Sequence, residues 1–176
     1  LSLIRTYLER DIPALGPRVP ADTLRRFWTL LRHAQGTLLN HAALANSLGI
    51  SGQTITRYLD LLIDLLLVRR LPAWSGNTLK RLIRTPQVYV RDSGLVHALL
   101  GLRSAEEVLG HPVAGNSWEG FAIENLIAAA PVGTPASFYR TSAGAEIDLI
   151  LELGRKDLWA IEVKRGSMPN VTKGYH

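Results

Sequence analysis

The spacing of apolar residues predicts helices in the first part of the chain. Residues 3–9 are expected to form a short helix, and a linker with three prolines follows it. Apolar side chains over residues 24–31 then recur at helical spacing, and Asp22 is the expected N-cap of that helix. The first packed segment is therefore expected to begin at about residue 21.

A second helical pattern has the spacing of a helix-turn-helix. It predicts a short helix over about 41–47, a turn at Gly49 and a longer helix from Ser51 to about Leu66. Small, turn and core residues stand where that motif needs them, namely at Ala45, Gly49, Ile50 and Ile55. The expected buried stripe consists of Leu44, Leu48, Ile50, Ile55, Leu59 and Leu62.

Two strand-like segments, 67–74 and 87–91, follow the longer helix and flank a polar connection. A helix-turn-helix followed by a hairpin is a winged helix. If this segment reads DNA, Gln53, Thr56 and Arg57 are expected near base edges. The side chains expected on phosphates are Arg69, Arg70, Lys80, Arg81 and Arg84.

The same segment also fits a winged helix that packs against protein. Its longer helix carries one arginine but two aspartates, Asp60 and Asp64, and it runs into an apolar stretch over residues 61–67. Aspartates do not attract a phosphate backbone, which weakens the case for DNA. Both interpretations stay open at this point.

The second half of the chain changes from helices to strands. Residues 92–101 predict a strand end, a turn and a short helix. A helix over residues 115–130, capped by Asn116 or Ser117, precedes a strand over residues 137–141 and a tight turn. The order is then helix, strand, turn and the hairpin described next.

Residues 146–164 alternate between apolar and charged on both sides of a four-residue polar turn, which predicts a β-hairpin. If Glu152 pairs with Leu158, the register places Asp148 directly opposite Glu162. Facing carboxylates repel each other, so a cation is expected between them. The apolar side of the second strand is expected to carry Trp159, Ile161 and Val163.

The expected cation is either Lys164, which lies on the same face as Glu162, or a divalent metal. An Asp followed by Glu-x-Lys on the adjacent strand resembles the core of the PD-(D/E)XK nuclease-like fold. Carboxylate oxygens suit Mg²⁺. A bound metal lowers the pKa of its water and stabilises charge on a scissile phosphate. The alternative is a solvated hairpin face with a cluster of charges.

Glu119 is the candidate for a third acidic group. It lies one helical turn before Ile123, so it borders the buried face of its helix and needs a partner there. The alternative is a first-turn glutamate favoured by the helix dipole. Glu124 is the substitute candidate for the same role. With Asp148 and Glu162, a third carboxylate would complete an acidic site.

Composition narrows the class of protein. The 176 residues include no cysteine, which excludes disulfides and thiolate metal sites and makes a cytoplasmic location the expectation. No apolar run approaches the length of a membrane span. Residues 1–100 carry 13 Arg and Lys against 6 Asp and Glu, whereas residues 101–176 carry 7 against 9. Only the first half therefore has the charge of a polyanion-binding module.

A series of short motifs runs through the chain at residues 58–62, 67–71, 77, 80–81, 89–95, 115–119, 138–141, 146–148 and 161–164. In these motifs the chain resembles a family, the domain of unknown function 4143 at the C-terminus of bacterial and archaeal AAA-type ATPases, over nearly its whole length. The resemblance implies an α+β fold, a winged helix-turn-helix followed by a PD-(D/E)XK restriction-endonuclease-like α/β core. Family members usually continue past the Glu-x-Lys strand, so this core is expected to be incomplete.

The resemblance also implies a division into domains. Residues 1–20 would be a linker or helix from a missing ATPase module, residues 21–101 a winged helix-turn-helix and residues 102–176 the nuclease-like core. ATP would bind only through the missing module, because the chain has no Gly-x(4)-Gly-Lys-Ser/Thr loop. Gln87 stands where the family often has lysine, which makes the wing less basic.

Carried over residue by residue, the resemblance implies a catalytic site of Glu119, Asp148, Glu162 and Lys164. Asp148 and Glu162 would hold Mg²⁺ or Mn²⁺, Lys164 would assist the water, and Glu119 would add to the metal shell. The predicted function is a DNA-associated domain of an AAA-type ATPase with a metal site that hydrolyses phosphodiesters. The alternative is a non-catalytic regulatory or protein-interaction domain of that ATPase. DNA and the ATPase module are the expected partners, a membrane is not, and a homo-oligomer stays open.

Overall fold

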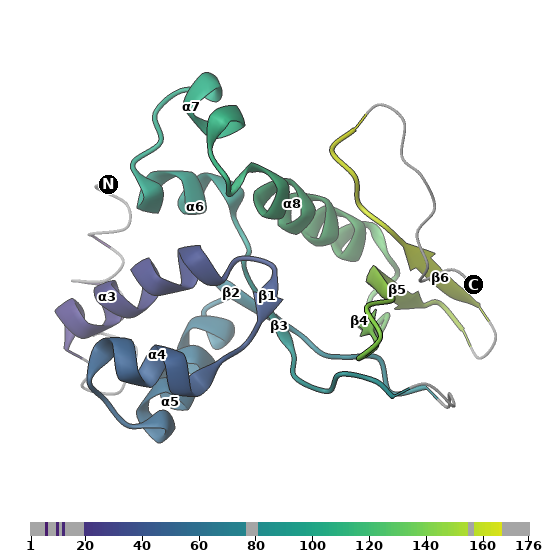
Figure 1. Cartoon of the computed structure of the whole chain (residues 1–176), viewed down its shortest axis with the longest axis horizontal. Helices are drawn as coiled ribbons and strands as arrows, with labels where there is room; N and C mark the ends of the chain where they lie inside the picture. The colour runs from purple at the N-terminus through teal and green to yellow at the C-terminus, as the bar shows by residue number, and fades with distance from the viewer. Residues whose placement is uncertain are drawn as a thin grey trace.

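The computed structural model describes residues 20–76, 81–154 and 157–166, together with Thr6, Arg10 and Ile12. These residues form six α-helices and two three-stranded antiparallel sheets, so the fold is mixed α+β. Three helices gather at one end of the molecule and the second sheet lies at the other, with α8 running between them (Figure 1). The helix expected over residues 3–9 lies outside the described residues, except for Thr6.

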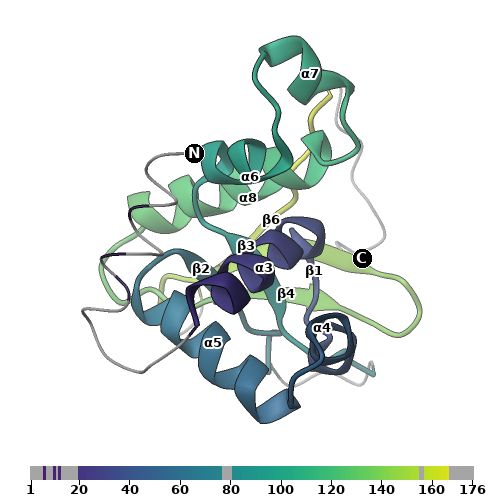
Figure 2. The same cartoon turned by 90° about the vertical axis from the view of Figure 1, so that its left-hand side faces the viewer.

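The elements follow one another with short connections. The helices are α3 (Ala21–Leu31), α4 (His41–Leu48), α5 (Gly52–Asp64), α6 (Ser93–Leu100), α7 (Ala105–Gly110) and α8 (Ala114–Ala129). The strands are β1 (Thr37–Leu38), β2 (Val68–Leu71), β3 (Gln87–Val90), β4 (Ala136–Arg140), β5 (Glu146–Glu152) and β6 (Leu158–Ile161). Seen from the side in Figure 2, α3 lies between α6 and the pair α4 and α5.

Local capping explains where α4 and α5 begin and end. The side chain of Asn40 accepts a hydrogen bond from the Ala43 amide at the start of α4, and Gly49 ends this helix in the left-handed conformation. Ser51 caps α5 through the Thr54 amide. The predicted turn at Gly49 and the start of the longer helix are confirmed, although that helix ends at residue 64 rather than at about 66.

The predicted apolar stripe of α4 and α5 is buried, with Ile50 partly so. It packs with the side chains of α3, among which Leu24, Phe27, Trp28 and Leu31 are almost inaccessible to solvent. Burying large aromatic and aliphatic side chains of this kind contributes roughly 1.5–3 kcal/mol each. The first core cluster therefore lies between these three helices.

The first sheet has the order β1-β3-β2, so β3 is its central strand. The predicted hairpin is confirmed, with Val68 opposite Val90. Alternate residues of β3 belong to two cores: Val88 and Val90 pack with α3, α4 and α5, whereas Tyr89 packs with α8 and the second sheet. The two-residue strand β1 was not predicted because it is too short for any periodicity.

The second sheet has the order β4-β5-β6. Both predicted strand pairs are confirmed, and Glu152 lies opposite Leu158 as expected. Trp159 lies opposite Leu151, on the apolar side of β6 as expected, yet it is 59% exposed. The reason is that β6 is an outer strand of this sheet in the described part of the chain, so its side chains have neighbours on one flank only.

The two halves of the chain are joined by backbone hydrogen bonds. The segments that follow β2 and precede β3 run beside β4, with bonds from the Trp74 amide to the Phe138 carbonyl and from the Ile83 amide to the Arg140 carbonyl. The second core cluster contains Leu71 and Tyr89 from the first sheet together with Ile123, Phe138, Leu149 and Leu151. The predicted winged-helix and nuclease-like segments therefore share one core.

Two capping predictions are wrong. Asp22 lies within the first turn of α3, because the helix already begins after Pro20, and its carboxylate is placed to interact with the helix dipole. Neither Asn116 nor Ser117 caps α8, which starts at Ala114. Asn116 donates to the Gln35 carbonyl at 2.6 Å and Ser117 is buried, so both side chains are used in packing α8 against its neighbours.

Candidate active site between α8 and the β5–β6 hairpin

The β5–β6 hairpin brings two carboxylates near each other. Its ladder ends with the pair Leu149 and Ile161, so Asp148 of β5 and Glu162 lie just beyond the last paired residues, where the charge of Glu162 acts on Asp148. The Oδ2 atom of Asp148 accepts a hydrogen bond from the Val163 amide at 2.7 Å, which fixes the carboxylate just beyond the end of β6. The two acids thus lie on neighbouring segments, as the alternation of residue types predicts.

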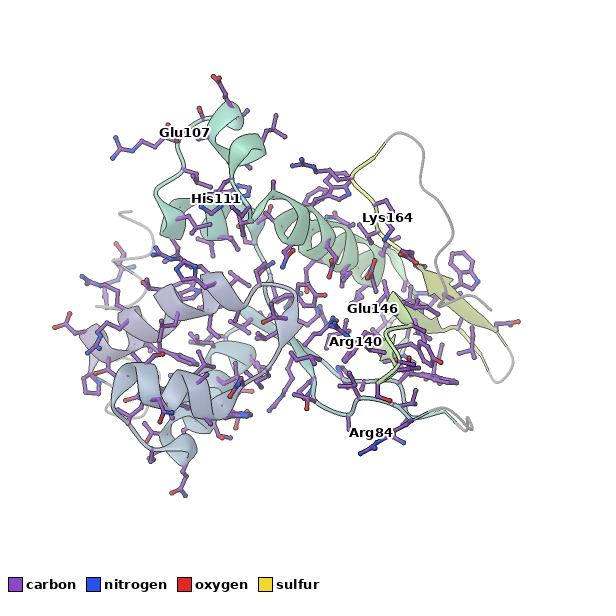
Figure 3. The ribbon with its side chains drawn as sticks, viewed as in Figure 1. Arg84, Glu107, His111, Arg140, Glu146 and Lys164 are labelled. Atoms are coloured by element: carbon purple, nitrogen blue, oxygen red, sulfur yellow. The ribbon has the colours of Figure 1, made fainter. Side chains whose placement is uncertain are left out.

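Lys164 supplies a cation beside these acids. Its Nζ atom forms an ion pair with Oε1 of Glu162, and this hydrogen bond raises the pKa of Lys164. The negative charges of Asp148 and Glu119 raise that pKa further. Figure 3 shows Lys164 on the segment that follows β6. Of the two candidates for the cation between the acids, Lys164 and a divalent metal, the lysine is in place.

Glu119 enters the same site from α8. Its Oε1 atom accepts a hydrogen bond from the Tyr89 hydroxyl at 2.5 Å. Gly36 lies so close that an added Cβ would be 3.3 Å from this oxygen, and its φ of +68° also favours glycine. Glu119 therefore points toward the first sheet, and the partner that its position on the helix demands is a tyrosine.

A chain of polar side chains continues from Glu119 to the hairpin. The Tyr89 oxygen is also 3.2 Å from Oε1 of Gln87, and Nε2 of Gln87 donates to Oε1 of Glu146 at 3.4 Å. Arg140 forms an ion pair with the same Glu146 oxygen at 3.3 Å (Figure 3). The chain therefore links α8, β3, β4 and β5.

This row of hydrogen-bonded side chains has one proton too few when Glu119 is ionised. The single hydroxyl proton of Tyr89 cannot be donated to both Glu119 and Gln87. When Glu119 is protonated, its own O–H can donate to the tyrosine oxygen, and the tyrosine can then donate to Gln87. Both contacts of the Tyr89 oxygen can therefore be hydrogen bonds at once when Glu119 is neutral.

The electrostatic surroundings act in the same direction. Burial raises the pKa of Glu119 to about 7, and the charges of Asp148 and Glu146 add to the effect, while the Tyr89 hydrogen bond and Lys164 oppose it. Burial also raises the pKa of Asp148, against the Val163 hydrogen bond. The pKa of Tyr89 is raised mainly by burial. Glu119 is thus a group that exchanges its proton near neutral pH.

The acids form a pair and a separate third group. Among the residues that the structure describes, no three Asp, Glu, His or Cys side chains converge closely enough to hold a metal ion. Asp148 and Glu162 are close enough for the charge of one to act on the other, whereas Glu119 is engaged by Tyr89. We refer to Glu119, Asp148, Glu162 and Lys164 as the carboxylate–lysine site.

Sequence reasoning missed three members of this arrangement: Tyr89, Gln87 and Glu146. Gln87 and Tyr89 are two residues apart on β3 and share one face, and Glu146 shares a face with Asp148. The strand period could have grouped each pair. Nothing local in the sequence indicates that the first sheet touches α8, which is a tertiary contact over about 30 residues of chain.

The residues predicted to contact DNA have different surroundings. Gln53 and Arg57 are exposed on α5, and Thr56 is half-buried with its hydroxyl bonded to the Gly52 carbonyl. Arg81 and Arg84 are exposed on the segment before β3. Lys80 lies outside the described residues.

Two of the predicted phosphate-binding arginines have acidic partners. Arg70 pairs with Asp60 at 3.0 Å on the surface. Arg69 is half-buried and pairs with Glu124, which also accepts a hydrogen bond from Arg91 at 2.8 Å. Glu124, the substitute candidate for the third acid, is thereby held between two arginines. The two pairs of Glu124 hold α8 against the first sheet. Glu119 is therefore the acid that α8 contributes to the carboxylate–lysine site.

The structure defines a mixed α+β protein with acids from a helix and a hairpin gathered around a lysine. Its family follows from comparison with known sequences. Residues 1–106, more than half of the chain, match the model of the domain of unknown function DUF8612, and the chain belongs to that family. Residues 114–175 match the domain of unknown function DUF4143, as the motifs predict. That match is shorter than expected, because the DUF8612 model matches the preceding residues.

Two mycobacterial proteins are similar to almost the whole chain. They are the uncharacterized proteins Mb2031c of Mycobacterium bovis and Rv2008c of Mycobacterium tuberculosis. Each is 45% identical over 170 residues, which are 97% of this chain and 38% of the relative. The chain thus spans less than half the length of these relatives. No solved structure matches it. No helix in the described part of the chain is long and apolar enough to cross a membrane.

Proposed function

We propose that this chain is the DNA-associated part of a larger AAA-type ATPase, and that its carboxylate–lysine site binds a divalent cation and hydrolyses phosphodiesters. The observation that carries the proposal is the hairpin register. The register ends at the pair Leu149 and Ile161, and continued by one residue it would bring Asp148 opposite Glu162, which forms an ion pair with Lys164. Two acids and a lysine at this spacing are the core motif of PD-(D/E)XK nucleases, and Glu119 adds a third acid from the facing helix.

The donor set suits a hard cation. Mg²⁺ is commonly bound through one or two carboxylates and keeps several of its waters, so Asp148 and Glu162 suffice as protein ligands. When bound, the cation would supply an acidified water and neutralise charge on the phosphate. Lys164 lies where it can orient that water or offset phosphate charge. Glu119, neutral below about pH 7 and ionised above it, can take up a proton at this site.

DNA association is supported by the first part of the molecule. The order helix, short strand, helix, helix and hairpin, from α3 to β3, is that of a winged helix. In such a fold the second helix of the helix-turn-helix enters the major groove with its first residues near the bases. Gln53 and Arg57 are exposed on that helix, and Arg81 and Arg84 are exposed on the wing.

The ATPase context rests on the DUF4143 match and on length. The relatives are long enough to hold a further module, since this chain accounts for 38% of each. We propose that ATP acts through that module, in the cytoplasm and with the option of self-association. The chain described here would couple the module to DNA.

Calorimetric titration of Mn²⁺ tests the cation site. The 176-residue chain should bind Mn²⁺, and Asp148→Ala should abolish binding. Glu152→Ala is the matched control, because Glu152 lies on the same strand and face but at the far end of β5. Mn²⁺-dependent nicking of DNA should follow the same pattern. Binding that persists unchanged in Asp148→Ala would show that the site lies elsewhere.

A non-catalytic role as a regulatory or protein-interaction domain of the ATPase is the second candidate. It is favoured by the pairing of Lys164 with Glu162 and by the lack of a converging acidic triad among the described residues. On this alternative the hairpin keeps its charges without binding a cation. Absence of Mn²⁺ binding in both the unaltered chain and Asp148→Ala would favour this role over hydrolysis.

A further inference from the structure

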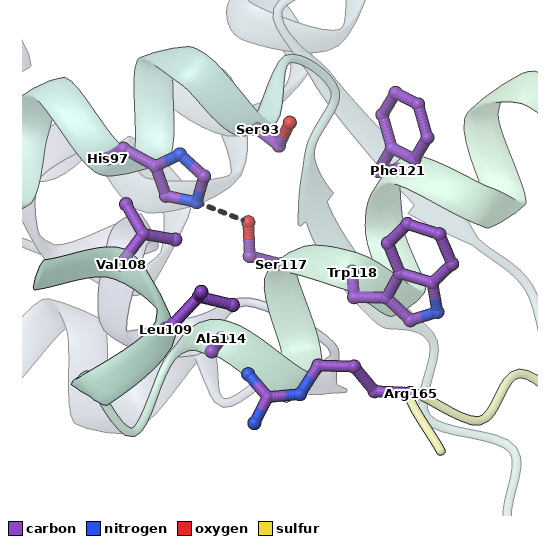
Figure 4. A pocket seen from close by; sticks show the side chains of 9 residues that line it. All are labelled: Ser93, His97, Val108, Leu109, Ala114, Ser117, Trp118, Phe121 and Arg165. Carbon is purple, nitrogen blue, oxygen red and sulfur yellow. Dashed lines mark hydrogen bonds between the residues drawn. The ribbon is translucent and has the colours of Figure 1, made fainter. Parts of the chain in front are cut away.

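An apolar pocket lies between α6, α7 and α8, and Arg165 completes its lining (Figure 4). Its volume is about 280 Å³, close to the lower end of the range for small-ligand pockets. Trp118 and Phe121 project from α8 into its wall, and Leu109 of α7 forms part of the opposite side. All three side chains are more than 40% exposed, so a ligand could reach them.

The two aromatic rings offer a flat apolar surface. The ring centroids of Trp118 and Phe121 are 5.8 Å apart with an angle of 30° between the planes. Such rings bind flat π-systems by stacking, and an aromatic side chain that is left exposed on a helix contributes nothing to the core. The pocket therefore has a surface that suits a planar heterocycle.

The polar groups of the pocket are a hydrogen-bonded pair of side chains and one arginine. His97 and Ser117 are joined by a hydrogen bond of 2.7 Å between Nε2 and Oγ, and burial lowers the pKa of His97, so the pair is neutral at neutral pH. Neutral donors and acceptors of this kind can bind the polar edge of a heterocycle. Arg165 is the charged residue of the lining, and an anionic group on the ligand would suit it.

Two residues that line the pocket are adjacent in sequence to residues of the carboxylate–lysine site. Trp118 precedes Glu119 on α8, and Arg165 follows Lys164 after β6. Arg165 and Trp118 line the same pocket, so a ligand with its anionic group at Arg165 can place its flat part against Trp118. A base joined to a phosphate has this arrangement of groups, whereas a peptide side chain rarely combines a planar heterocycle with an adjacent anion.

We propose that this pocket binds an unpaired nucleobase, and that the substrate of the neighbouring site is single-stranded or locally unpaired nucleic acid. The inference rests on the proposed function for its phosphate contact. A base in a duplex has both faces stacked and its edge paired, so it cannot enter the pocket without leaving the helix.

The test compares two labelled oligonucleotides of equal length, a single strand with bases and an abasic strand with the same phosphates. Binding to the 176-residue chain is measured by fluorescence anisotropy in EDTA, which removes metal and therefore cleavage. Trp118→Ala should weaken binding of the strand with bases about fivefold to a hundredfold and leave the abasic strand unaffected. Phe121→Ala should act in the same direction, and Trp159→Ala is the control, an exposed tryptophan on β6.

Three results would overturn the inference. They are no binding of the strand with bases, equal effects of Trp118→Ala on both strands, and a loss in Trp159→Ala as large as that in Trp118→Ala. The result is independent of the Mn²⁺ titration. Base-dependent binding without Mn²⁺ binding would support the nucleobase pocket and contradict the hydrolytic function. Mn²⁺ binding without base-dependent binding would support the cation site and contradict the nucleobase pocket. Both exposed positions on α8 can lose their rings without opening the core.

Discussion

At the scale of single residues, the site depends on one proton shared along a chain of side chains. Glu119 and Gln87 both lie within hydrogen-bonding distance of the Tyr89 hydroxyl, which can donate to one of them. A neutral Glu119 satisfies both contacts, and burial next to Asp148 and Glu146 favours the same state. The groups that face Glu119 are Tyr89 from β3, Asp148 and Glu146 from β5, and Lys164. Glu119 therefore belongs to the buried polar network and not only to the acidic face.

Glu119→Gln should make the protein less sensitive to pH. The folded state holds the proton of Glu119 up to about pH 7, whereas the ordinary pKa is 4.5, so this carboxyl contributes stability that is present at low pH and lost as pH rises through 7. The free energy of unfolding of the unaltered chain, relative to Glu119→Gln, should fall by on the order of 3 kcal/mol between acidic and mildly alkaline pH. Chemical denaturation at a series of pH values measures this difference.

The control for this experiment is Glu107→Gln, which removes an exposed glutamate on α7. It should give no pH-dependent difference of comparable size. Glutamine has both an amide N–H that can donate to the Tyr89 oxygen and an oxygen that can accept from it, so Glu119→Gln removes the titration and retains the contact. A constant difference between the unaltered chain and Glu119→Gln across the pH range would mean that Glu119 has the same pKa in the folded and the unfolded chain.

At the scale of elements, α8 determines where the site forms. It packs on the first sheet through a polar contact, since Gln35 bonds to both backbone groups of Val90 and Asn116 bonds to the Gln35 carbonyl. Gly120 lies in the middle of this contact. A Cβ there would be 2.5 Å from Nε2 of Gln35 and 3.1 Å from the Tyr89 ring. The absence of a side chain at residue 120 thus lets the helix approach the strand that carries Tyr89.

Gly120→Ala should destabilise the protein by about 1–3 kcal/mol, because the added methyl group forces Gln35 out of a buried contact. The helix would also shift relative to Tyr89, so the pKa of Glu119 should change. Gly115→Ala in the same helix is the matched control, because nothing lies within 4 Å of an added Cβ there. That variant should be as stable as the unaltered chain or up to about 1 kcal/mol more stable. Thermal denaturation compares the two, and equal stabilities would contradict the close approach.

At the scale of the whole molecule, the sequence predicts features set within one element or hairpin. It does not predict contacts between elements that are distant in the chain. The register that pairs Glu152 with Leu158 follows from alternation along one hairpin, and the inward position of Glu119 follows from helical periodicity. Tyr89 was not predicted as the partner of Glu119 because β3 meets α8 only in the folded chain. Ion pairs between distant residues are also not predicted from the sequence. Arg69 was predicted to bind phosphate, but in the folded chain it pairs with Glu124.

The distribution of charge leads to a prediction about DNA. Arg81 and Arg84 are exposed before β3, and Arg84 points away from the body of the molecule in Figure 3. Each phosphate that a protein neutralises adds about 0.9 to the slope of log affinity against log salt. If both arginines contact the backbone, the variant Arg81→Ala with Arg84→Ala should bind duplex DNA more weakly and with a slope smaller by about 2.

Arg103→Ala removes an exposed arginine between α6 and α7, outside the segment before β3, and is the control for charge alone. It should change affinity little and leave the slope unaltered. Titrations of labelled duplex at several salt concentrations measure both quantities. A slope that stays the same in the double variant would mean that the wing does not lie on DNA. The α3-to-β3 segment would then be a protein-packing module, and the acidic Asp60 and Asp64 of α5 would face a protein partner instead of a phosphate backbone.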